Sequence, residues 1–308
     1  MNLYHSTYCY EVGSTHERIS IDIQECLFFG RSPVQQISIC QTQALGKILL
    51  LDGVLQSSEK DEYRYYESLV QPAMLSHPSP RSALVIGGAD GAVAREILRH
   101  PSIERLVMVD NDELLIDQCY IHLPEWHQGA FDDPRLELII DDCRRYVRNV
   151  QERFDIIVID SGDRLVRRDF GRHLISHEFI DDVSKLLTNR GVMTLQAGSV
   201  SVGKNDSFVD SLKYIDGLFN YRQPYYTYVP SFWSEWGFIV ASDAFDFELL
   251  SEADVDLRIK CRHMSSDLKF INGRTIHTMA IFPKDVSSAF DGQLNIHAGS
   301  EIVLNNVV

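Results

Sequence analysis

The sequence predicts an α/β protein in which a small antiparallel β domain precedes a doubly wound, mostly parallel sheet. Short apolar runs alternate with helical segments from about residue 60 onward, as in buried parallel strands joined by crossover helices. The first of these runs ends in the glycine turn Gly87–Gly91, and the acid Asp110 follows the second run about twenty residues later. This layout is typical of a nucleoside-binding crossover. We therefore expect a Rossmann-like, methyltransferase-type seven-stranded sheet with a small N-terminal antiparallel β-hairpin domain.

The N-terminal domain is predicted from strand patterns in the first sixty residues. Glu25–Phe29 is a short apolar run that Gly30–Pro33 stops, and Val34–Cys40 alternates with period two. The run Ile48–Leu51 ends at a hairpin-type Asp-Gly turn, after which a further short strand resumes at residues 54–56. We expect this β-hairpin domain to span residues 1–60 and the Rossmann-like catalytic domain to span residues 61–308.

The second domain is predicted from the alternation of strands and helices. A helix with apolar and aromatic residues on one face is expected at 61–76. Strands are expected at 83–86, 106–109, 136–140, 155–159 and 192–196, and helices at 91–100, 112–121, 142–150, 176–188 and 205–219. Two more strands, at 225–229 and 237–241, are expected to complete the sheet with an antiparallel edge, and the tail from 262 is mixed.

Composition narrows the classes of partner. The 308-residue chain has a net charge of −15, which argues against a phosphate-binding surface and so against nucleic acid as a general partner. Its six cysteines include no C-x-x-C pair, so a zinc site or a disulfide framework is not expected. No apolar stretch has the length of a signal peptide core or a membrane span. We expect a cytoplasmic protein with no membrane partner.

Acidic residues follow four successive predicted strands. They are Asp90, Asp110, Asp141 with Asp142, and Asp160 with Asp163. Ligands of open α/β sheets bind beyond the carboxyl ends of the strands, so these acids should meet at one edge. Each aspartate is also a good N-cap for the helix that follows it, which is the alternative for any single one. Four together indicate a cationic ligand, such as a sulfonium or an amine, and disfavour a pyrophosphate.

The same acids suggest a chemical role. A carboxylate shielded by aromatic walls can hold an alkylammonium and accept its proton as the nitrogen attacks. The segment 219–238 is rich in aromatic residues, including Phe232 and Trp236, whose rings can cover methylenes and attract cations. Packing of two edge strands in the core is the alternative reading of these rings. The glycines Gly87 and Gly88 let the backbone approach a nucleoside closely.

Several linked motifs resemble one family. They are Ser32–Gln35, Gly46–Gln56, Asp61–Glu67, His77–Pro80, Gly87–Gly91, Arg95-Glu96, His100-Pro101, Asp132–Arg135, Phe154-Asp155, Gln196–Gly198, Val229–Phe232, Trp236–Phe238, Leu268–Asn272 and Phe282-Pro283. In this order, over about residues 20–290, they resemble the polyamine aminopropyltransferases, the spermidine and thermospermine synthase family. The resemblance implies a homodimer or homotetramer that needs no metal. It also implies decarboxylated S-adenosylmethionine as aminopropyl donor, a polyamine such as putrescine or spermidine as amine acceptor, and 5′-methylthioadenosine as co-product.

The resemblance also implies residue roles. On the donor side, Asp110 is expected to bind the ribose, Asp142 and Cys143 the adenine, and Asp90 the donor's primary ammonium, with Gln35 and Gln56 lining the donor site. On the acceptor side, Asp160 matches the general base and Tyr65 and Asp163 position the amine, with Tyr66, Glu67, Phe232 and Trp236 as further substrate contacts.

The chain departs from the family pattern in ways that keep other functions open. Ala89 replaces the third glycine of the motif, Cys143 replaces a smaller residue, and Tyr66 replaces Gln or His. The gatekeeping loop diverges most, with arginines at Arg164, Arg167, Arg168 and Arg172. If these face inward, they favour an S-adenosylmethionine-dependent amine N-methyltransferase or a 3-amino-3-carboxypropyl transferase acting on a carboxylate-bearing acceptor. A non-catalytic nucleoside- or polyamine-binding homologue is the third reading.

Overall fold

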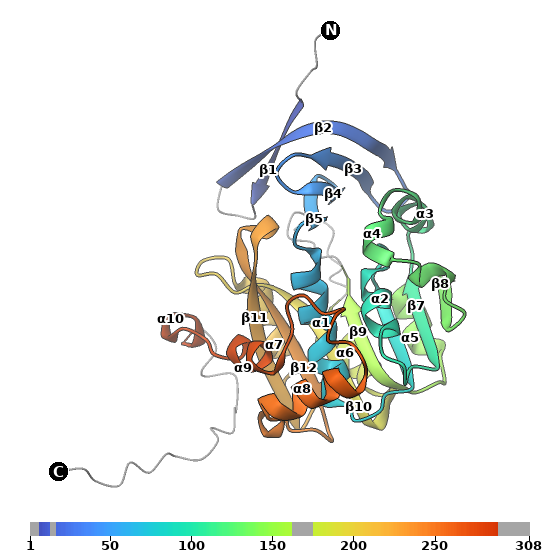
Figure 1. The fold of residues 1–308 in the computed structure, drawn as a ribbon, viewed down its shortest axis with the longest axis vertical. Coiled ribbons are helices and arrows are strands. Elements are labelled where there is room, and N and C mark those ends of the chain that lie inside the picture. The colour runs from blue at the N-terminus through green and yellow to red at the C-terminus, as the bar shows by residue number, and fades with distance from the viewer. Residues whose placement is uncertain (1–5, 13–16, 162–174, 289–308) are drawn as a thin grey trace, which may run out of the picture.

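The computed structural model describes residues 6–12, 17–161 and 175–288, and it contains two separate sheets (Figure 1). The first is a five-stranded antiparallel sheet in the order β1-β2-β3-β4-β5. Its strands are β1 (Ser6–Val12), β2 (Glu17–Arg31), β3 (Gln36–Thr42), β4 (Gly46–Leu51) and β5 (Val54–Ser58). The curved sheet lies above the α/β part in Figure 1, and the chain descends from β5 into the first helix.

The second sheet has seven strands in the order β11-β12-β10-β9-β6-β7-β8. The strands are β6 (Ser82–Gly87), β7 (Arg105–Asp110), β8 (Leu136–Ile140), β9 (Phe154–Asp160), β10 (Leu187–Ser199), β11 (Tyr221–Val229) and β12 (Ser234–Ser242). Strands β10, β9, β6, β7 and β8 run parallel, and β12 and β11 add an antiparallel edge. The predicted seven-stranded, Rossmann-like sheet is therefore confirmed.

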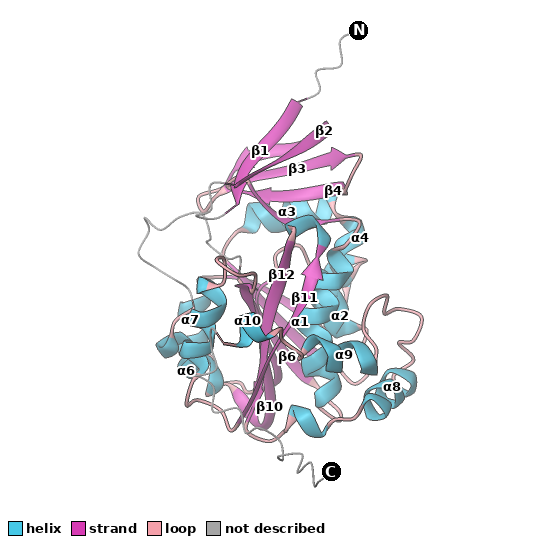
Figure 2. Cartoon of the chain, turned by 90° about the vertical axis from the view of Figure 1, so that its left-hand side faces the viewer, coloured by secondary structure: helices cyan, strands magenta, loops and turns pink. Residues whose placement is uncertain are grey.

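Helices cover both faces of this sheet (Figure 2). The helices are α1 (Glu62–Ser76), α2 (Ala92–Leu98), α3 (Glu113–His122), α4 (Pro124–His127), α5 (Cys143–Asn149), α6 (His177–Ser184), α7 (Asp206–Ile215), α8 (Glu252–Cys261), α9 (Gly273–Met279) and α10 (Lys284–Ser287), with short 3-10 turns η2 (Ala130–Asp132), η4 (Pro230–Phe232) and η5 (Phe247–Leu249). Apolar side chains of α1, α2, α3, α8 and α9 share one core cluster, and those of α5, α6 and α7 share the other. Successive residues of β6 alternate between the two clusters, which explains why its sequence is continuously apolar.

Several element boundaries differ from the sequence-based expectation: β1 was not predicted, and β10 and β11 begin earlier than expected. Strand β2 begins at Glu17, well before the predicted run 25–29. Ile19, Ile21 and Ile23 alternate with polar residues along its first half, a pattern that the expectation left out. Register shifts between Ile23 and Glu25 and between Cys26 and Phe28 then interrupt the ladder. The helix predicted at 176–188 ends at Ser184, since β10 already begins at Leu187. Among the described helices, none is both long and apolar enough to cross a membrane. A domain boundary near residue 60 remains a proposal, favoured by the separation of the two sheets.

Candidate active site

The carboxyl ends of three neighbouring parallel strands bring the predicted acids together. In the register of the sheet, Gly87 at the end of β6 pairs with Asp160 at the end of β9, and Asp110 ends β7 on the other side of β6. The negative charges of Asp90 and Asp110 both raise the pKa of Asp160, as expected of carboxylates that share one site. These three acids therefore lie at a common edge of the sheet.

The glycine turn is required by close backbone packing. Gly87 has a φ of +88°, and a Cβ built on it would lie 2.3 Å from the carbonyl oxygen of Asp160. Gly91, the N-cap of α2, has a φ of +78°, and a Cβ there would meet His127 and Phe131. Ala89, by contrast, is not among the residues with positive φ, so the side chain that replaces the family's third glycine is accommodated without backbone strain.

Asp160 has the properties of a group that exchanges a proton near neutral pH. The Tyr65 hydroxyl, which α1 supplies, donates to its Oδ1 at 2.7 Å. Burial and the charge of Asp90 raise the pKa of Asp160 to about 7, and the Tyr65 hydrogen bond opposes that rise. No lysine or arginine in the described part of the chain forms an ion pair with Asp160, Asp90 or Asp110. The site thus carries negative charge that a cationic ligand can neutralise.

Asp90 is held by hydrogen bonds on both carboxylate oxygens. Its Oδ1 accepts from the backbone N–H of Ala92 at 3.0 Å, and its Oδ2 accepts from the Tyr66 hydroxyl. Burial raises the pKa of Asp90. Burial and the negative charges of Asp90 and Asp160 raise the pKa of Tyr66. The hydroxyl of Tyr66 therefore donates to Asp90, the acid predicted to bind the donor ammonium. The sequence-based expectation was that Tyr66 lies beside the acceptor.

Asp110 is surrounded by contacts that tie the N-terminal domain to the sheet. Its Oδ1 accepts from the backbone N–H of Asp112 at 2.9 Å, and burial raises its pKa to about 6. Asp112, the N-cap of α3, in turn accepts from the Ser32 hydroxyl at 2.8 Å and from the Gln35 amide at 2.9 Å. Gln35 is thus linked to Asp110 through Asp112, and its place on the donor side stays a prediction. Gln56 is half-buried on β5, and its amide donates to the carbonyl oxygen of Val54 at 3.1 Å.

The residues predicted to bind adenine lie at the start of α5. Asp142 is the N-cap of this helix, and its side chain accepts from the backbone N–H of Arg145 at 2.9 Å. Its side chain therefore caps the helix, which was the alternative to ligand binding for each of these aspartates. Cys143 is buried and donates to the carbonyl oxygen of Val109 at 3.4 Å. Burial, with Asp110 and Asp142 nearby, raises the pKa of the Cys143 thiol to about 12. This thiol is a packing group beside Asp110.

Aromatic rings form one wall beside Asp160. The Tyr65 ring lies edge-on to Phe232 at 5.9 Å, and Phe232 lies edge-on to Trp236 at 4.8 Å. The Trp236 N–H donates to Gln196 at 3.2 Å, and the Gln196 amide donates to the carbonyl oxygen of Ser161 at 2.9 Å. Gln196 thereby connects the aromatic wall to the end of β9, a role that the sequence analysis did not assign.

Only part of the aromatic segment reaches this wall. Tyr225 is buried and stacks on Phe238, so both belong to the core, as the alternative reading of these rings proposed. Tyr228 and Trp233 are exposed.

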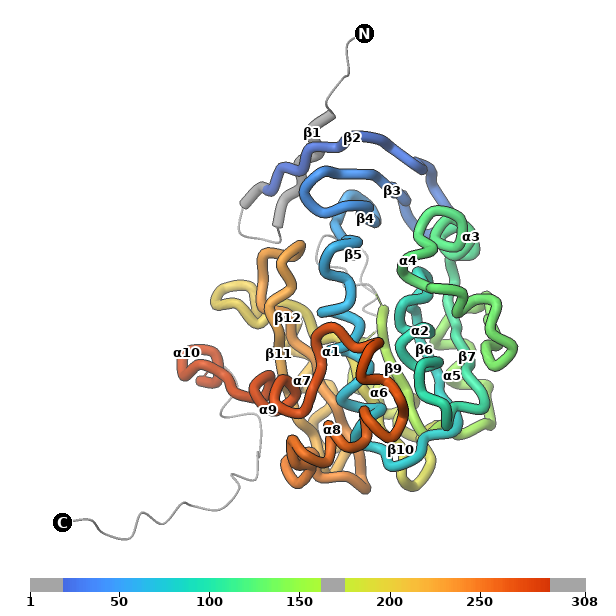
Figure 3. The backbone as a smooth tube through the Cα atoms, viewed as in Figure 1, coloured from blue at the N-terminus to red at the C-terminus, as the bar shows by residue number. Residues whose placement is uncertain are grey.

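Glu67 requires a correction. The sequence analysis counted it as a substrate contact, but its side chain is 0% exposed and both carboxylate oxygens accept backbone N–H groups. The donors are Lys269 at 2.8 Å and Phe270 and Ile271 at 2.9 Å. Figure 3 shows this C-terminal segment, coloured orange to red, beside α1. Glu67 therefore anchors the segment after α8.

Other predicted residues cannot be placed in the site. The structure does not describe Asp163, Arg164, Arg167, Arg168 and Arg172.

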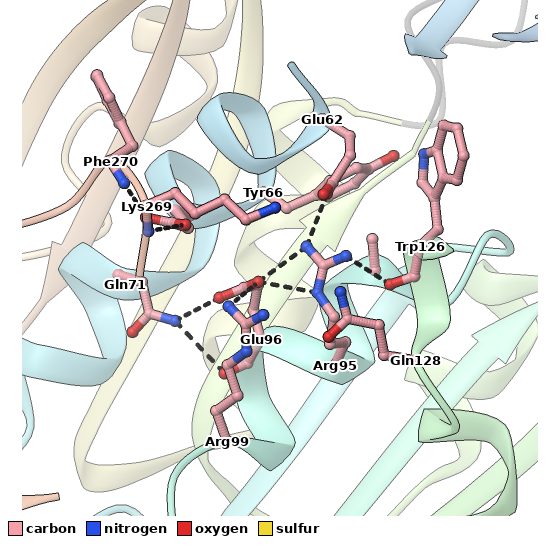
Figure 4. A network of polar contacts seen from close by, with 12 residues as sticks. Glu62, Tyr66, Gln71, Arg95, Glu96, Arg99, Trp126, Gln128, Lys269 and Phe270 are labelled. Atoms are coloured by element: carbon pink, nitrogen blue, oxygen red, sulfur yellow. Dashed lines mark hydrogen bonds and ion pairs between the residues drawn. The ribbon is translucent and has the colours of Figure 1, made fainter. Parts of the chain in front are cut away.

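A second layer of charges lies between α1 and α2 (Figure 4). Arg95 forms ion pairs with Glu62 at 2.7 Å and Glu96 at 2.9 Å, and it donates to the carbonyl oxygen of Trp126 at 2.6 Å. The Trp126 indole in turn donates to the Ser57 hydroxyl at 2.6 Å. Sequence reasoning noted Arg95 and Glu96 only as motif residues. Arg95 and Glu96 are the two charged residues of the otherwise apolar helix α2, and this pattern could have indicated a buried ion pair.

The fold and the site define a Rossmann-like protein with a group of buried acids at the carboxyl edge of its sheet. Comparison with known proteins agrees: residues 62–250 match the family described as Spermine/spermidine synthase domain, and residues 7–59 match the Spermidine synthase tetramerisation domain. The chain therefore belongs to the spermine/spermidine synthase family, which confirms the resemblance seen in its motifs.

Individual relatives cover most of the chain. It is 40% identical to the polyamine aminopropyltransferase of Aeropyrum pernix over 85% of this chain and 83% of that protein. It is also 40% identical to polyamine aminopropyltransferase 2 of Pseudomonas aeruginosa, over 77% and 68% respectively. Among solved structures, the spermidine synthase from Thermotoga maritima has a TM-score of 0.82 at 27% identity, covering 96% of this chain and 98% of that one. A spermidine synthase in complex with the transition state analogue AdoDATO has a TM-score of 0.85 at 28% identity, covering 94% and 98%.

Proposed function

We propose that this chain transfers the aminopropyl group of decarboxylated S-adenosylmethionine to an amine of a polyamine, with Asp160 as the general base. The family, the names of the relatives and the AdoDATO complex of a structural neighbour support aminopropyl transfer. The observation that carries the role of Asp160 is its carboxylate, 2.7 Å from the Tyr65 hydroxyl and with a pKa raised to about 7. A base with a pKa near the working pH is substantially deprotonated and still has enough proton affinity to accept the proton of the amine.

The chemistry assigned to these residues is a single displacement. Asp160 takes the proton of the acceptor ammonium while the freed nitrogen pair attacks the carbon beside the sulfonium. The new C–N bond forms as the C–S bond breaks, and the sulfur leaves with its electron pair as neutral 5′-methylthioadenosine. Tyr65 keeps the carboxylate of Asp160 oriented, because its hydroxyl donates to one oxygen and leaves the other to face the amine.

The donor side favours the decarboxylated form. The two oxygens of Asp90 are fixed by Ala92 and Tyr66, and Asp160 and Asp110 add negative charge nearby. An ammonium group gains from that charge, whereas the carboxylate of intact S-adenosylmethionine would lie against it and be repelled. We propose that Asp110 binds the ribose hydroxyls, with Gln35 and Gln56 beside the nucleoside.

The acceptor is proposed to be a polyamine because the aromatic wall and the acids suit a chain of methylenes between ammonium groups. Tyr65, Phe232 and Trp236 supply apolar surface and ring faces for a cation. The deciding experiment incubates the protein with the aminopropyl-labelled donor and a pooled set of diamines, polyamines and amino acids, and identifies the product by mass. A labelled polyamine supports the proposal. A labelled amino acid, or no label transfer at all, contradicts it.

We further propose that the active form is an oligomer built through the N-terminal sheet. Residues 7–59 match a domain described as a tetramerisation domain, and Phe29 on β2 and Ile121 on α3 expose 66% and 61% of their surface. Such exposed apolar residues on elements in contact are typical of association surfaces. Light scattering on the purified protein is expected to give a dimer or tetramer, and Phe29→Asp is expected to lower that mass. A monomeric wild-type protein would contradict the proposal.

A further inference from the structure

A pair of thiols lies in the N-terminal sheet, away from the acids of the site. Cys26 on β2 is directly opposite Cys40 on β3 in the antiparallel register. Cys40 belongs to a small core cluster of this sheet that includes Ile21 and Ile48 and is separate from the two clusters of the α/β part. Opposed residues of an antiparallel pair point to the same face, so the two thiols face each other.

The two thiols are paired across the strands and differ in access to solvent. Cys26 is exposed and its Sγ donates to the carbonyl oxygen of Phe28 at 3.4 Å, whereas Cys40 is 3% exposed. Burial, the charge of the Cys26 thiolate and a hydrogen bond with the Cys26 side chain raise the pKa of Cys40 to about 12. Cys26 is therefore the thiol that a reagent in solution meets first, and Cys40 is the partner behind it.

A covalent bond between them requires only a small approach of the two strands. Opposed side chains in an antiparallel pair have Cβ atoms about 4.5–5.5 Å apart, and a disulfide needs about 3.5–4.5 Å. The register shift between Cys26 and Phe28 interrupts the ladder directly after Cys26. A bulge at this point lets β2 move locally by the small distance required without breaking a continuous ladder.

We propose that Cys26 and Cys40 form a reversible oxidation site, at which a small-molecule disulfide converts the two thiols into a cross-strand disulfide. The Cys26 thiolate attacks one sulfur of the reagent, forms a mixed disulfide and releases one thiolate. Cys40 then loses its proton to solvent and attacks the sulfur of Cys26, which releases the second thiolate. The protein loses two electrons and two protons, and the reagent disulfide becomes two thiols.

The site has a structural consequence because of the segment that it closes. Residues 26–40 include Ser32 and Gln35, which hold Asp112 beside the donor side of the active site. A bond between Cys26 and Cys40 restricts this segment in the unfolded chain, so the oxidised protein is expected to melt at a temperature at least about 3 °C higher than the reduced protein.

The test exposes the full-length protein to oxidised glutathione, blocks remaining thiols and maps the peptides by mass. In the wild type, the Cys26 and Cys40 peptides are expected to be joined, after a transient glutathione adduct on Cys26. Cys40→Ser is expected to stop at that adduct. Cys26→Ser is expected to leave Cys40 unmodified. Cys261→Ser, which removes an exposed cysteine on α8, serves as the matched control and is expected to form the Cys26–Cys40 bond as the wild type does.

Two results would overturn the proposal. One is a wild-type protein in which both thiols stay free, or in which glutathione remains on Cys26, while the protein is folded by circular dichroism. The other is a wild-type protein in which the two peptides are joined but the melting temperature does not rise, or rises and does not fall again after reduction with dithiothreitol. The bond would then not restrict the segment 26–40 as proposed.

Discussion

Two groups of buried acids contact α1, and they differ in how the fold compensates their charge. At the edge of the sheet, Asp90 and Asp160 accept hydrogen bonds from hydroxyl and amide donors and form no ion pair in the described part of the chain. Burial raises the pKa of both, and the charge of Arg95 opposes the rise at Asp90. Between α1 and α2, Glu62 and Glu96 share the guanidinium of Arg95. In the second region the ion pairs with Arg95 offset part of the effect of burial, which still raises the pKa of Glu62, whereas the acids of the first region have no such ion pair and are left for a ligand. The difference separates acids that form ion pairs within the fold from acids that we propose to take part in chemistry.

The largest expected effect breaks the ion-paired region. Arg95→Met leaves the buried carboxylates Glu62 and Glu96 without their shared cation, and the removal of one partner from a buried pair costs about 3–5 kcal/mol. Chemical denaturation is expected to show that loss. Arg105→Met is the matched control, because Arg105 pairs with Glu137 and Glu152 at the surface, where such pairs contribute about 1 kcal/mol or less. Equal losses in the two variants would contradict the distinction.

The next effect concerns the region without ion pairs. Asp160→Asn keeps the shape of the side chain but cannot accept a proton, so the turnover number is expected to fall at least about a hundredfold, or about 2.7 kcal/mol in the barrier. Donor binding, measured by calorimetry, is expected to change little. The control is Asp210→Asn, which removes an exposed acid of α7 that pairs with Lys213. Full activity of Asp160→Asn would exclude this residue as the base.

The pH dependence follows from the raised pKa of Asp160. Its value of about 7 means that the free enzyme loses the carboxylate as pH falls below 7, so kcat/KM is expected to drop about tenfold per unit there. Bound cationic substrates favour the carboxylate, so the acidic limb of kcat is expected at lower pH. Steady-state kinetics between pH 5.5 and 8.5 measure both limbs. Coincident limbs near the ordinary pKa of aspartate would contradict the electrostatic coupling of Asp160 with Asp90.

A smaller effect is expected on the nucleoside side. Asp110→Asn replaces the proposed acceptor of two ribose hydroxyls by a group with one acceptor oxygen, so the dissociation constant for 5′-methylthioadenosine is expected to rise about tenfold. Asp117→Asn, on an exposed position of α3, is the matched control. Isothermal titration of both variants makes the comparison, and an unchanged affinity of Asp110→Asn would remove Asp110 from the ribose site.

The sequence allows some of these acids and their contacts to be predicted and not others. The acids of the site were predictable because each follows an apolar run, and parallel strands place their carboxyl ends at one edge. The environment of Glu67 was not predictable in this way. Its partners are backbone N–H groups of residues 269–271, about two hundred positions along the chain, and no local pattern encodes such a contact. Tyr66 shows an intermediate case, since its place on α1 was predicted and its partner Asp90 was not.

The smallest effect tests the comparison through stability without any ligand. Because the pKa of Asp160 is higher in the folded than in the unfolded protein, the folded state binds more protons between about pH 4 and 7, and stability is lost as pH rises through that window. The full shift corresponds to about 4 kcal/mol, which partial exposure of Asp160 reduces through solvent screening. Asp160→Asn cannot ionise, so the variant is expected to be more stable than the wild type at pH 8, by about 1–2 kcal/mol, and no more stable at pH 4. Chemical denaturation at both pH values measures the difference. A variant less stable at pH 8 would mean that the fold itself compensates the charge of Asp160, as the ion pair with Arg95 does in part for Glu62, and the contrast between the two regions would be lost.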